Sequence, residues 1–329
     1  MREDYPEKPY LSWMGWGMLE ACSRRWFLYN FAKQLEGDFG RDIEIERAVS
    51  YWTAFAGQLA DDGVTEAIRY FKAHRVWRTD LDLWLKETAL EYVHESRAYR
   101  EAALAGIDLP KRTRQILDRY FFDEVPDKEA HLHVLKTARA AVQNFFSTDI
   151  PSRIEVADRS WLMCERAERF PWTVVDGVPV YAVYDFALKT PDMVTIFDWK
   201  TGQWTPQKEQ RALRQLHWYA LYAITEWGYQ SEQIRLAPVF LSVNAGYEES
   251  PPDCNLLQEI RTEWATRHAE IKALMDRYSR CDELLEHFPM TESLQSCAGC
   301  VFRTCSGYAR IRQSNALNPV KFAVQGEIA

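Results

Sequence analysis

Met193-Val-Thr-Ile-Phe-Asp-Trp-Lys200 is the stretch that decides the fold, together with Val178-Pro-Val-Tyr-Ala-Val-Tyr-Asp-Phe-Ala-Leu188 just before it. Both runs are rich in β-branched and aromatic residues, which favour strands. The turn-forming Lys189-Thr-Pro-Asp192 lies between them. We therefore predict two adjacent strands joined as a hairpin.

Charged side chains converge at the end of this hairpin. Side chains two residues apart on a strand share a face, so Asp198 and Lys200 project together while Trp199 turns to the other side. Asp185, late in the first strand, can face them. Two carboxylates form a hard-oxygen site suited to Mg²⁺ or Mn²⁺, and a neighbouring ammonium can stabilise charge on a phosphate. The pattern indicates phosphodiester hydrolysis, although Asp-x-Lys alone is more often an ordinary cross-strand salt bridge.

The rest of the chain predicts helices before the hairpin and one further strand after it. Residues 12–140 are mostly helical by their three- and four-residue apolar spacing, most clearly at 80–94 and 129–142. A helix from Gln207 to Trp227 ends at Gly228, and it is followed by a strand over 234–243 and a helix over 256–285. This order predicts an α/β sheet with a helical lobe before it.

Composition indicates a soluble cytoplasmic protein. Of 329 residues, 47% are hydrophobic, and the charged start Met1-Arg-Glu-Asp-Tyr-Pro6 lacks the apolar stretch of a secretory signal. No run approaches the roughly 18 apolar residues that span a bilayer. The net charge of −8 argues against a protein held to nucleic acid by bulk charge. A local basic groove stays open, with these candidates: Arg24, Arg25, Arg211 and Arg214.

Four cysteines predict a metal centre. Cys297, Cys300 and Cys305 follow a C-x2-C-x4-C pattern, which offers one sulfur fewer than a tetrahedral zinc or a cubane iron-sulfur cluster requires. Cys22 is the candidate for the fourth ligand, and the metal would then join the two ends of the chain. The alternative is chance buried thiols. The other cysteines are scattered singly and are interpreted as structural: Cys164, Cys254 and Cys281.

A resemblance to a known family covers these features. Asp185, Ile196-Phe-Asp-Trp-Lys-Thr-Gly202 and Gln215-Leu-His-Trp-Tyr-Ala220 resemble the D…DxKTG…QxxxY series of the PD-(D/E)xK nuclease superfamily, in its RecB-like branch. Ser12 to Tyr29 resembles the opening helices of the branch that carries a four-cysteine iron-sulfur cluster. That branch includes the CRISPR-associated Cas-type exonucleases and the nuclease domain of AddB. The late cysteines here are spaced one residue more tightly than the common pattern.

The resemblance implies a restriction-endonuclease-like fold, an α/β core with a mixed central sheet flanked by helices. It also implies a 4Fe-4S cluster that joins the N- and C-terminal segments, and Mg²⁺ or Mn²⁺ at the hairpin. The expected segments are N-terminal helices with the first cysteine, a helical insertion, the nuclease core and the cysteine-cluster segment, in this order: 1–60, 61–155, 156–285 and 286–329.

Residue by residue, the resemblance implies roles at the hairpin and on the helix after it. Asp185 and Asp198 correspond to the family's metal ligands, and Lys200 corresponds to its catalytic lysine. Gln215 and Tyr219 are one helical turn apart on a single face. The family uses this pair to position substrate and active-site groups, whereas taken alone it is equally a helix face with a half-buried tyrosine.

A third metal ligand is expected on an earlier helix. Gly57-Gln-Leu-Ala-Asp-Asp-Gly63 resembles the family's G-x-x-x-H helix, but Asp61 stands where the family has a histidine ligand. Aspartate can bind Mg²⁺, so the site is expected to survive with one more negative charge. His94 is the nearest histidine candidate and is interpreted as a surface residue, while Glu165 resembles a supporting family glutamate.

Three interpretations of function compete. The first is a metal-dependent deoxyribonuclease, an exonuclease acting on single-stranded DNA or duplex ends, with a structural 4Fe-4S cluster. The second is a DNA-binding subunit of a larger DNA-processing or defence complex whose nuclease site is weak or idle. The third is a zinc-stapled interaction protein. The chain has no G-x-x-x-x-G-K-S/T motif, so any helicase activity would come from a partner chain.

Overall fold

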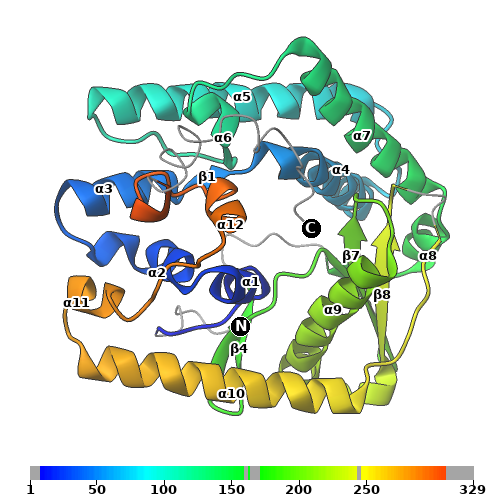
Figure 1. Cartoon of the computed structure of the whole chain (residues 1–329). Helices are drawn as coiled ribbons and strands as arrows, with labels where there is room; N and C mark the ends of the chain where they lie inside the picture. Colours follow the sequence, from blue (N-terminus) through cyan, green and yellow to red (C-terminus); the bar gives the residue numbers. More distant parts are fainter. Residues whose placement is uncertain (1–7, 159–161, 164–170, 243–245, 309–329) are drawn as a thin grey trace. The chain divides into compact units, whose positions relative to one another are not determined.

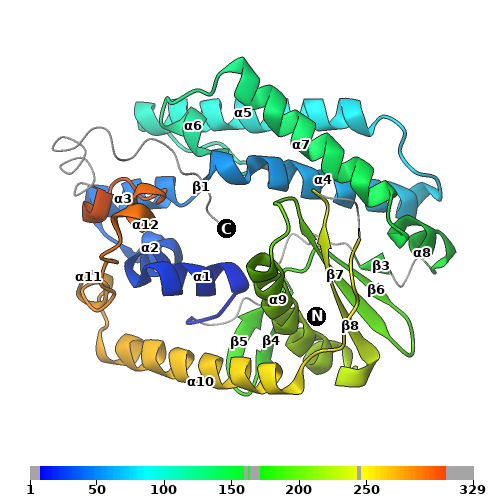
Figure 2. The ribbon, with the colours of Figure 1, turned by 45° about the vertical axis from the view of Figure 1, so that its right-hand side comes forward.

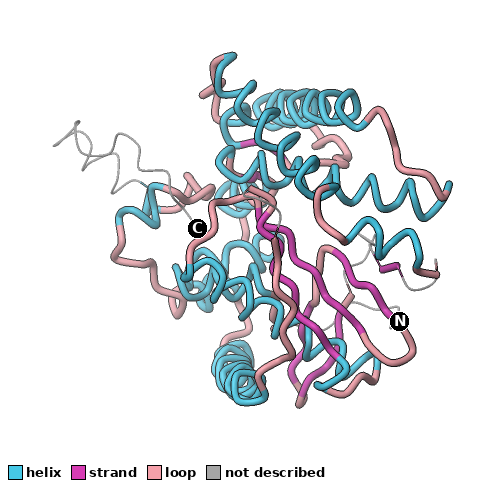
Figure 3. The backbone as a smooth tube through the Cα atoms, turned by 90° about the vertical axis from the view of Figure 1, so that its right-hand side faces the viewer, coloured by secondary structure: helices cyan, strands magenta, loops and turns pink. Residues whose placement is uncertain are grey.

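The hairpin lies at the centre of a four-stranded mixed sheet. The strand order is β3-β6-β7-β8, where β6 pairs antiparallel with β7 and β7 pairs parallel with β8. Figure 1 labels β7 and β8, Figure 2 labels all four strands, and Figure 3 shows the sheet strands side by side. The bounds are β3 Leu162–Met163, β6 Phe186–Lys189, β7 Val194–Lys200 and β8 Ile234–Phe240.

The computed structural model describes residues 8–158, 162–163, 171–242 and 246–308. Its contacts divide the chain into two compact units, each assembled from three stretches. Unit 1 contains the sheet and comprises Met1–Trp13, Ala56–Ala89 and Asp127–Ala269. Unit 2 comprises Met14–Phe55, Leu90–Pro126 and Glu270–Ala329.

Helix α9 (Pro206–Trp227) makes the parallel crossover from β7 to β8, and it packs on both strands (Figure 2). The Thr205 hydroxyl caps its start by accepting from the Lys208 amide, and Pro206 suits the first turn. Gly228 ends the helix at φ 75°, a left-handed conformation that glycine adopts without a steric penalty. The predicted helix is confirmed.

The first predicted strand is in fact two strands. β5 (Val178–Tyr181) pairs with β4 (Trp172–Val175) in a separate two-stranded sheet, and β6 begins only at Phe186. Asp185 therefore precedes its strand instead of lying late in it. The reason is visible at Trp199, whose amide donates to the Asp185 carboxylate at 2.7 Å where a backbone carbonyl would otherwise continue the ladder. The strand predicted to reach residue 243 ends at Phe240.

Helices complete unit 1. Gly63 on α4 lies so close to the neighbouring helices that a Cβ atom there would stand 2.9 Å from side-chain atoms of Leu85 and Val142. The predicted helices at 80–94 and 129–142 are confirmed within α5 and α7. Some helices contribute residues to both units. Their bounds are α4 Trp52–His74, α5 Leu81–Ala105, α7 Lys128–Phe146, α8 Ile150–Val156, η3 Ser231–Gln233 and α10 Cys254–Arg277.

Unit 2 packs short helices around an aromatic core. Phe27 stacks on Phe31 at 4.8 Å between ring centres and lies 5.0 Å from Phe288, and all three side chains are buried. The elements are α1 Trp13–Ala21, α2 Ser23–Phe31, η1 Ala32–Gln34, α3 Gly37–Glu46, β1 Val49–Ser50, β2 Ile116–Leu117, α6 Asp118–Phe121, α11 Cys281–Leu285 and α12 Leu294–Ala298.

The helix predicted over 256–285 is interrupted. α10 ends at Arg277, and Arg280 takes an extended conformation before α11 begins. The break lets the Tyr278 ring stack on His287, with 4.1 Å between ring centres. None of the helices in the described ranges is both long and apolar enough to cross a membrane.

Candidate active site and cysteine cluster

The end of β7 places Asp198 and Lys200 side by side. The Lys200 ammonium lies 2.5 Å from the Asp198 carboxylate, and that carboxylate is almost fully buried. Trp199 faces the other way and packs edge-on against Phe145, with 5.6 Å between ring centres. The alternation predicted from the strand period is confirmed.

Asp185 joins this pair through the loop before β6. Its carboxylate accepts from the Trp199 amide, which fixes it beside the strand end. Burial raises the pKa of Asp185 well above its usual value, and the charges of Asp61 and Asp198 raise it further. Burial also raises the pKa of Asp198, against the opposing attraction of Lys200. The structure thus brings the predicted carboxylates within electrostatic reach of one another.

A chain of hydrogen bonds runs from β7 to α9. The Lys200 ammonium donates to Gln215 Oε1 at 2.9 Å, and Gln215 Nε2 donates to the Tyr219 hydroxyl at 2.8 Å. Burial opposes the charge on Lys200, but attraction from Asp198 and Asp185 outweighs burial and raises its pKa. Burial and the same two carboxylates raise the pKa of Tyr219 well above its usual value. Lys200 therefore stays an ammonium, and Tyr219 stays a neutral phenol.

Asp61 reaches the site from α4. Gly57 and Asp61 share a helix face four residues apart, and a Cβ atom at Gly57 would stand 2.9 Å from Thr201 Oγ1. This glycine therefore lets α4 approach the residue that follows Lys200. The Asp61 charge raises the pKa of both Asp185 and Tyr219, which places it with the predicted site residues.

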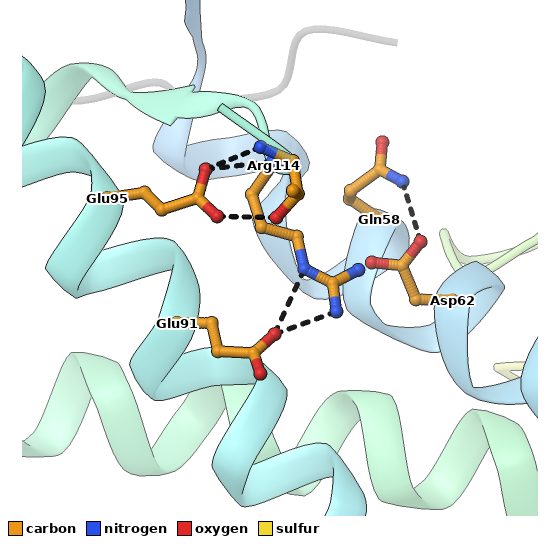
Figure 4. A network of polar contacts seen from close by, with 6 residues as sticks. Gln58, Asp62, Glu91, Glu95 and Arg114 are labelled. Carbon is orange, nitrogen blue, oxygen red and sulfur yellow. Dashed lines mark hydrogen bonds and ion pairs between the residues drawn. The ribbon is translucent and has the colours of Figure 1, made fainter. Parts of the chain in front are cut away.

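The neighbouring candidates have other surroundings. Asp62 is buried and accepts from Gln58 Nε2 at 3.3 Å (Figure 4). His94 is exposed on α5 in unit 2, whereas the hairpin residues belong to unit 1. The carboxylates of Glu91 and Glu95 near it bind Arg114, at 2.8 Å to the guanidinium and 3.0 Å to the backbone amide (Figure 4). The predicted supporting residue, Glu165, lies outside the described residues.

The four predicted cluster cysteines gather in unit 2. Cys22 precedes α2, Cys297 lies in α12, and all four are free thiols. Burial raises the pKa of Cys300 to about 11, and the charges of Cys305 and Cys22 add to it. Burial also raises the pKa of Cys305, to which Cys22 and Cys297 contribute. Cys300 and Cys305 thus interact electrostatically with Cys22, and Cys297 interacts with Cys305.

Hydrogen bonds tie the late segment to the early helices. The Ser23 hydroxyl donates to the Pro289 carbonyl at 2.9 Å, and Arg24 Nε donates to the Phe288 carbonyl at 2.6 Å. At the other end, the buried Glu46 carboxylate accepts from the Thr304 amide and hydroxyl at 3.1 Å. Residues from the two ends of the sequence therefore meet in unit 2 through these hydrogen bonds.

The donor sets can be tested against the expected metals. Among the residues that the structure describes, no three His, Cys, Asp or Glu side chains stand close enough to hold a metal ion as they are. Their chemistry nevertheless fits. At the hairpin, Asp61, Asp185 and Asp198 oppose a single ammonium, so full ionisation leaves negative charge that a divalent cation would balance.

Arg25 and Tyr51 were not identified from the sequence as neighbours of the cysteines. Arg25 Nε and the Tyr51 hydroxyl are buried and make no hydrogen bond, and the guanidinium lies 5.4 Å from the centre of the Tyr51 ring. The charge of Arg25 lowers the pKa of Cys300. The pKa of Tyr51 is raised mainly by burial, and the charge of Cys300 raises it further. Buried donors without acceptors are costly, and sulfur atoms of a cluster would accept from them.

Comparison with known families decides the class of protein. The model of the PD-(D/E)XK nuclease superfamily matches residues 17–305, which is most of the chain. The chain belongs to the PD-(D/E)XK nuclease superfamily. Superfamily members are generally nucleases, which are hydrolases that act on nucleic acid, and they typically use Mg²⁺ or Mn²⁺. The mixed helix and sheet structure is consistent with their α/β fold. No curated protein and no solved structure matches the chain significantly.

Proposed function

We propose that the protein is a metal-dependent deoxyribonuclease of the RecB-like branch, acting as an exonuclease on single-stranded DNA or duplex ends. The observation that carries the proposal is a series of contacts in which Asp198 forms an ion pair with Lys200, and Lys200 is hydrogen-bonded through Gln215 to Tyr219, while the charge of Asp198 also acts on Asp185. An ordinary surface salt bridge would be exposed, whereas Asp198 and Tyr219 in this series are buried.

Each residue has a part that its contacts support. Asp185, Asp198 and Asp61 would hold Mg²⁺ or Mn²⁺, which when bound polarises a phosphodiester and favours ionisation of a water. Lys200, kept charged by its neighbours, stabilises negative charge that grows on the phosphate. Gln215 accepts from that ammonium and so orients it, while the neutral Tyr219 holds the amide of Gln215 in place.

The direct test is cleavage of end-labelled single- and double-stranded DNA with Mg²⁺ and with Mn²⁺. We expect the parent protein to cut, and we expect Lys200→Ala to lose cleavage by about 100-fold or more, since electrostatic groups of this kind contribute on the order of 3 kcal/mol. Lys33→Ala is the matched control, because Lys33 is an exposed surface lysine that pairs with Glu44. Equal cutting by Lys200→Ala and parent would contradict the proposal.

The second candidate is a DNA-binding subunit with an idle nuclease site, in a larger DNA-processing or defence complex. Asp61 in place of the family histidine is the observation that favours it. A parent protein that binds DNA and leaves it uncut with either metal would support this candidate over the first.

We further propose that Cys22, Cys297, Cys300 and Cys305 hold a structural 4Fe-4S cluster. The coupled thiols and the buried donors Arg25 and Tyr51 support it. Anaerobically purified protein should carry iron and absorb visible light, whereas a colourless protein with zinc would support the zinc-stapled interpretation.

A further inference from the structure

Trp204 is exposed next to the proposed active site. It lies in the short link between β7 and α9, two residues after Gly202, and 48% of its surface is accessible. The other tryptophans among the described residues are buried or half-buried. The Trp204 indole N–H donates to Glu209 at 3.1 Å, which fixes the ring against the start of α9. A large apolar ring held out to solvent in this chain therefore needs an explanation.

Two cations follow Trp204 closely in sequence, on the first two turns of α9. The Lys208 ammonium lies 3.7 Å from where a side chain at Gly202 would begin. Arg211 is exposed on α9, one helical turn before Gln215, the residue that accepts a hydrogen bond from Lys200. Within the described part of the chain, neither Lys208 nor Arg211 forms an ion pair. Arg214, one turn further along α9, is by contrast bound by Glu259 at 2.8 Å and by Glu263 at 2.5 Å.

We propose that Trp204, Lys208 and Arg211 form a subsite, here called the α9 platform, that binds the single-stranded part of a nucleic acid next to the cleavage site. Trp204 stacks on one unpaired base, and the two cations contact the phosphates beside it. This inference rests on the proposed nuclease function and adds to it the residues that bind the unpaired strand.

The chemistry favours an unpaired strand over a duplex. A base offers its flat face to a tryptophan only when it is unstacked, and such stacking is tolerant of sequence because every base has a π-face. Unpaired cations attract phosphates, and in a protein of net charge −8 this attraction acts only locally. A duplex would present its phosphates to Lys208 and Arg211 but would leave Trp204 without a partner.

The experiment measures binding by fluorescence anisotropy in EDTA, so that no strand is cut. Its probes are a labelled single-stranded oligonucleotide, the same strand with abasic sites and a blunt duplex, and its variants are Trp204→Ala and Trp204→Phe. For the single strand we expect Trp204→Ala to bind about five- to 150-fold more weakly, from a stacking contribution of roughly 1–3 kcal/mol per base. Trp204→Phe should keep most of the affinity, and parent and Trp204→Ala should bind the abasic strand equally.

Salt dependence tests the cations. Each lost phosphate contact reduces the slope of log affinity against log salt by about 0.7 for single strands. We therefore expect Lys208→Ala and Arg211→Ala each to flatten the slope, while Lys33→Ala leaves it unchanged.

The outcomes separate this inference from the proposed function. A parent protein that neither binds nor cuts nucleic acid would contradict both the proposed function and the α9 platform. If the parent cuts DNA and Trp204→Ala binds the single strand as well as the parent, only the α9 platform is wrong. Equal losses on the single strand, the abasic strand and the duplex also overturn it, because they would mean that Trp204 supports the fold and does not stack on a base. Thermal melting of each variant identifies that case independently.

Discussion

Asp61 and Asp62 are adjacent in sequence but have different surroundings. Asp62 is buried and accepts from Gln58, whereas the charge of Asp61 acts on Asp185 and Tyr219. A carboxylate close enough to raise the pKa of Asp185 is placed to share a cation with it in the proposed site. This contrast makes the pair a natural test of the metal shell.

We predict that Asp61→Ala weakens divalent-ion binding and slows cleavage at least tenfold. Asp61→His should keep activity and move the preference from Mg²⁺ toward Mn²⁺, because imidazole suits transition metals better than carboxylate does. Isothermal titration with each metal measures the affinity, and cleavage rates measure the activity. Asp62→Asn serves as the control, which should change stability more than metal preference. Full activity in Asp61→Ala would show that Asp61 is a solvated helix residue.

Glu46 makes stability depend on pH. Burial raises its pKa to about 7 from 4.5, despite the hydrogen bonds that it accepts from Thr304. The folded state therefore holds this proton more tightly than the unfolded state. The free energy of unfolding should be highest below pH 4.5 and fall as the pH rises toward 7, by about 3 kcal/mol from this one group at 1.36 kcal/mol per pKa unit.

We predict that Glu46→Gln loses much of this pH dependence. Thermal melting at pH 5 and pH 8 should show a larger fall in the parent than in the variant. Glu44→Gln is the control, because Glu44 is a partly exposed carboxylate of the same helix that pairs with Lys33. Parallel pH profiles for parent and Glu46→Gln would assign the dependence to other groups.

At the scale of residues, periodicity was sufficient where side chains share an element. It placed Asp198 with Lys200 on a strand and Gln215 with Tyr219 on a helix, and the structure joins the two pairs directly. It could not identify Arg25 or Tyr51 as neighbours of the cysteines, because a buried donor without an acceptor becomes visible only once the surroundings are packed.

At the scale of elements, Gly57 controls how closely α4 approaches the end of β7. Alanine favours a helix by up to about 1 kcal/mol over glycine, but its Cβ atom would stand 2.9 Å from Thr201 Oγ1. The contact forces Thr201 or α4 to shift, and the shift would move Asp61 relative to Asp198.

We predict that Gly57→Ala reduces cleavage several-fold with little change in melting temperature, and that adding Thr201→Ala restores part of the activity by removing the hydroxyl. The double-mutant cycle measures this coupling, with Thr201→Ala alone as the control. If the effects of Gly57→Ala and Thr201→Ala are additive, the contact between the two positions does not affect cleavage.

Element boundaries were predicted less well than element types. The run 178–188 has one continuous strand pattern, yet its ends pair with different strands because Asp185 replaces a backbone acceptor at Trp199. The apolar spacing of 256–285 likewise gave no signal of the break after Arg277, which depends on the packing of Tyr278 on His287. In both cases a contact with a residue outside the element accompanies the boundary.

At the scale of the whole molecule, the division into two units does not follow the order of the chain. The four segments predicted along the sequence stay a prediction, while contacts group three separated stretches into each unit. That Cys22 joins the late cysteines in one metal site stays a prediction, which rests on the need of a tetrahedral centre with three thiols on one loop for a fourth ligand from elsewhere. The hydrogen bonds of Ser23, Arg24 and Glu46 to the late segment could not be predicted in the same way.

The cluster prediction belongs to this scale, because its ligands come from both ends of the chain. Replacing Cys22, Cys297, Cys300 or Cys305 singly by serine should release iron, bleach the visible band and lower the melting temperature. Metal binding at structural thiolate sites contributes on the order of 10 kcal/mol to folding, judged from zinc peptides, so the effect should exceed the loss of a single buried thiol. Iron analysis and calorimetry measure both effects.

Cys254→Ser is the matched control, since Cys254 is an exposed free thiol at the start of α10. It should keep full iron and melt with the parent. Protein contacts already hold the late segment against α2 and α3, so the cysteine variants should stay folded at low temperature and remain measurable. A Cys22→Ser protein with full iron content and an unchanged melting temperature would remove Cys22 from the ligand set and, with it, the proposal that the metal joins the two ends of the chain.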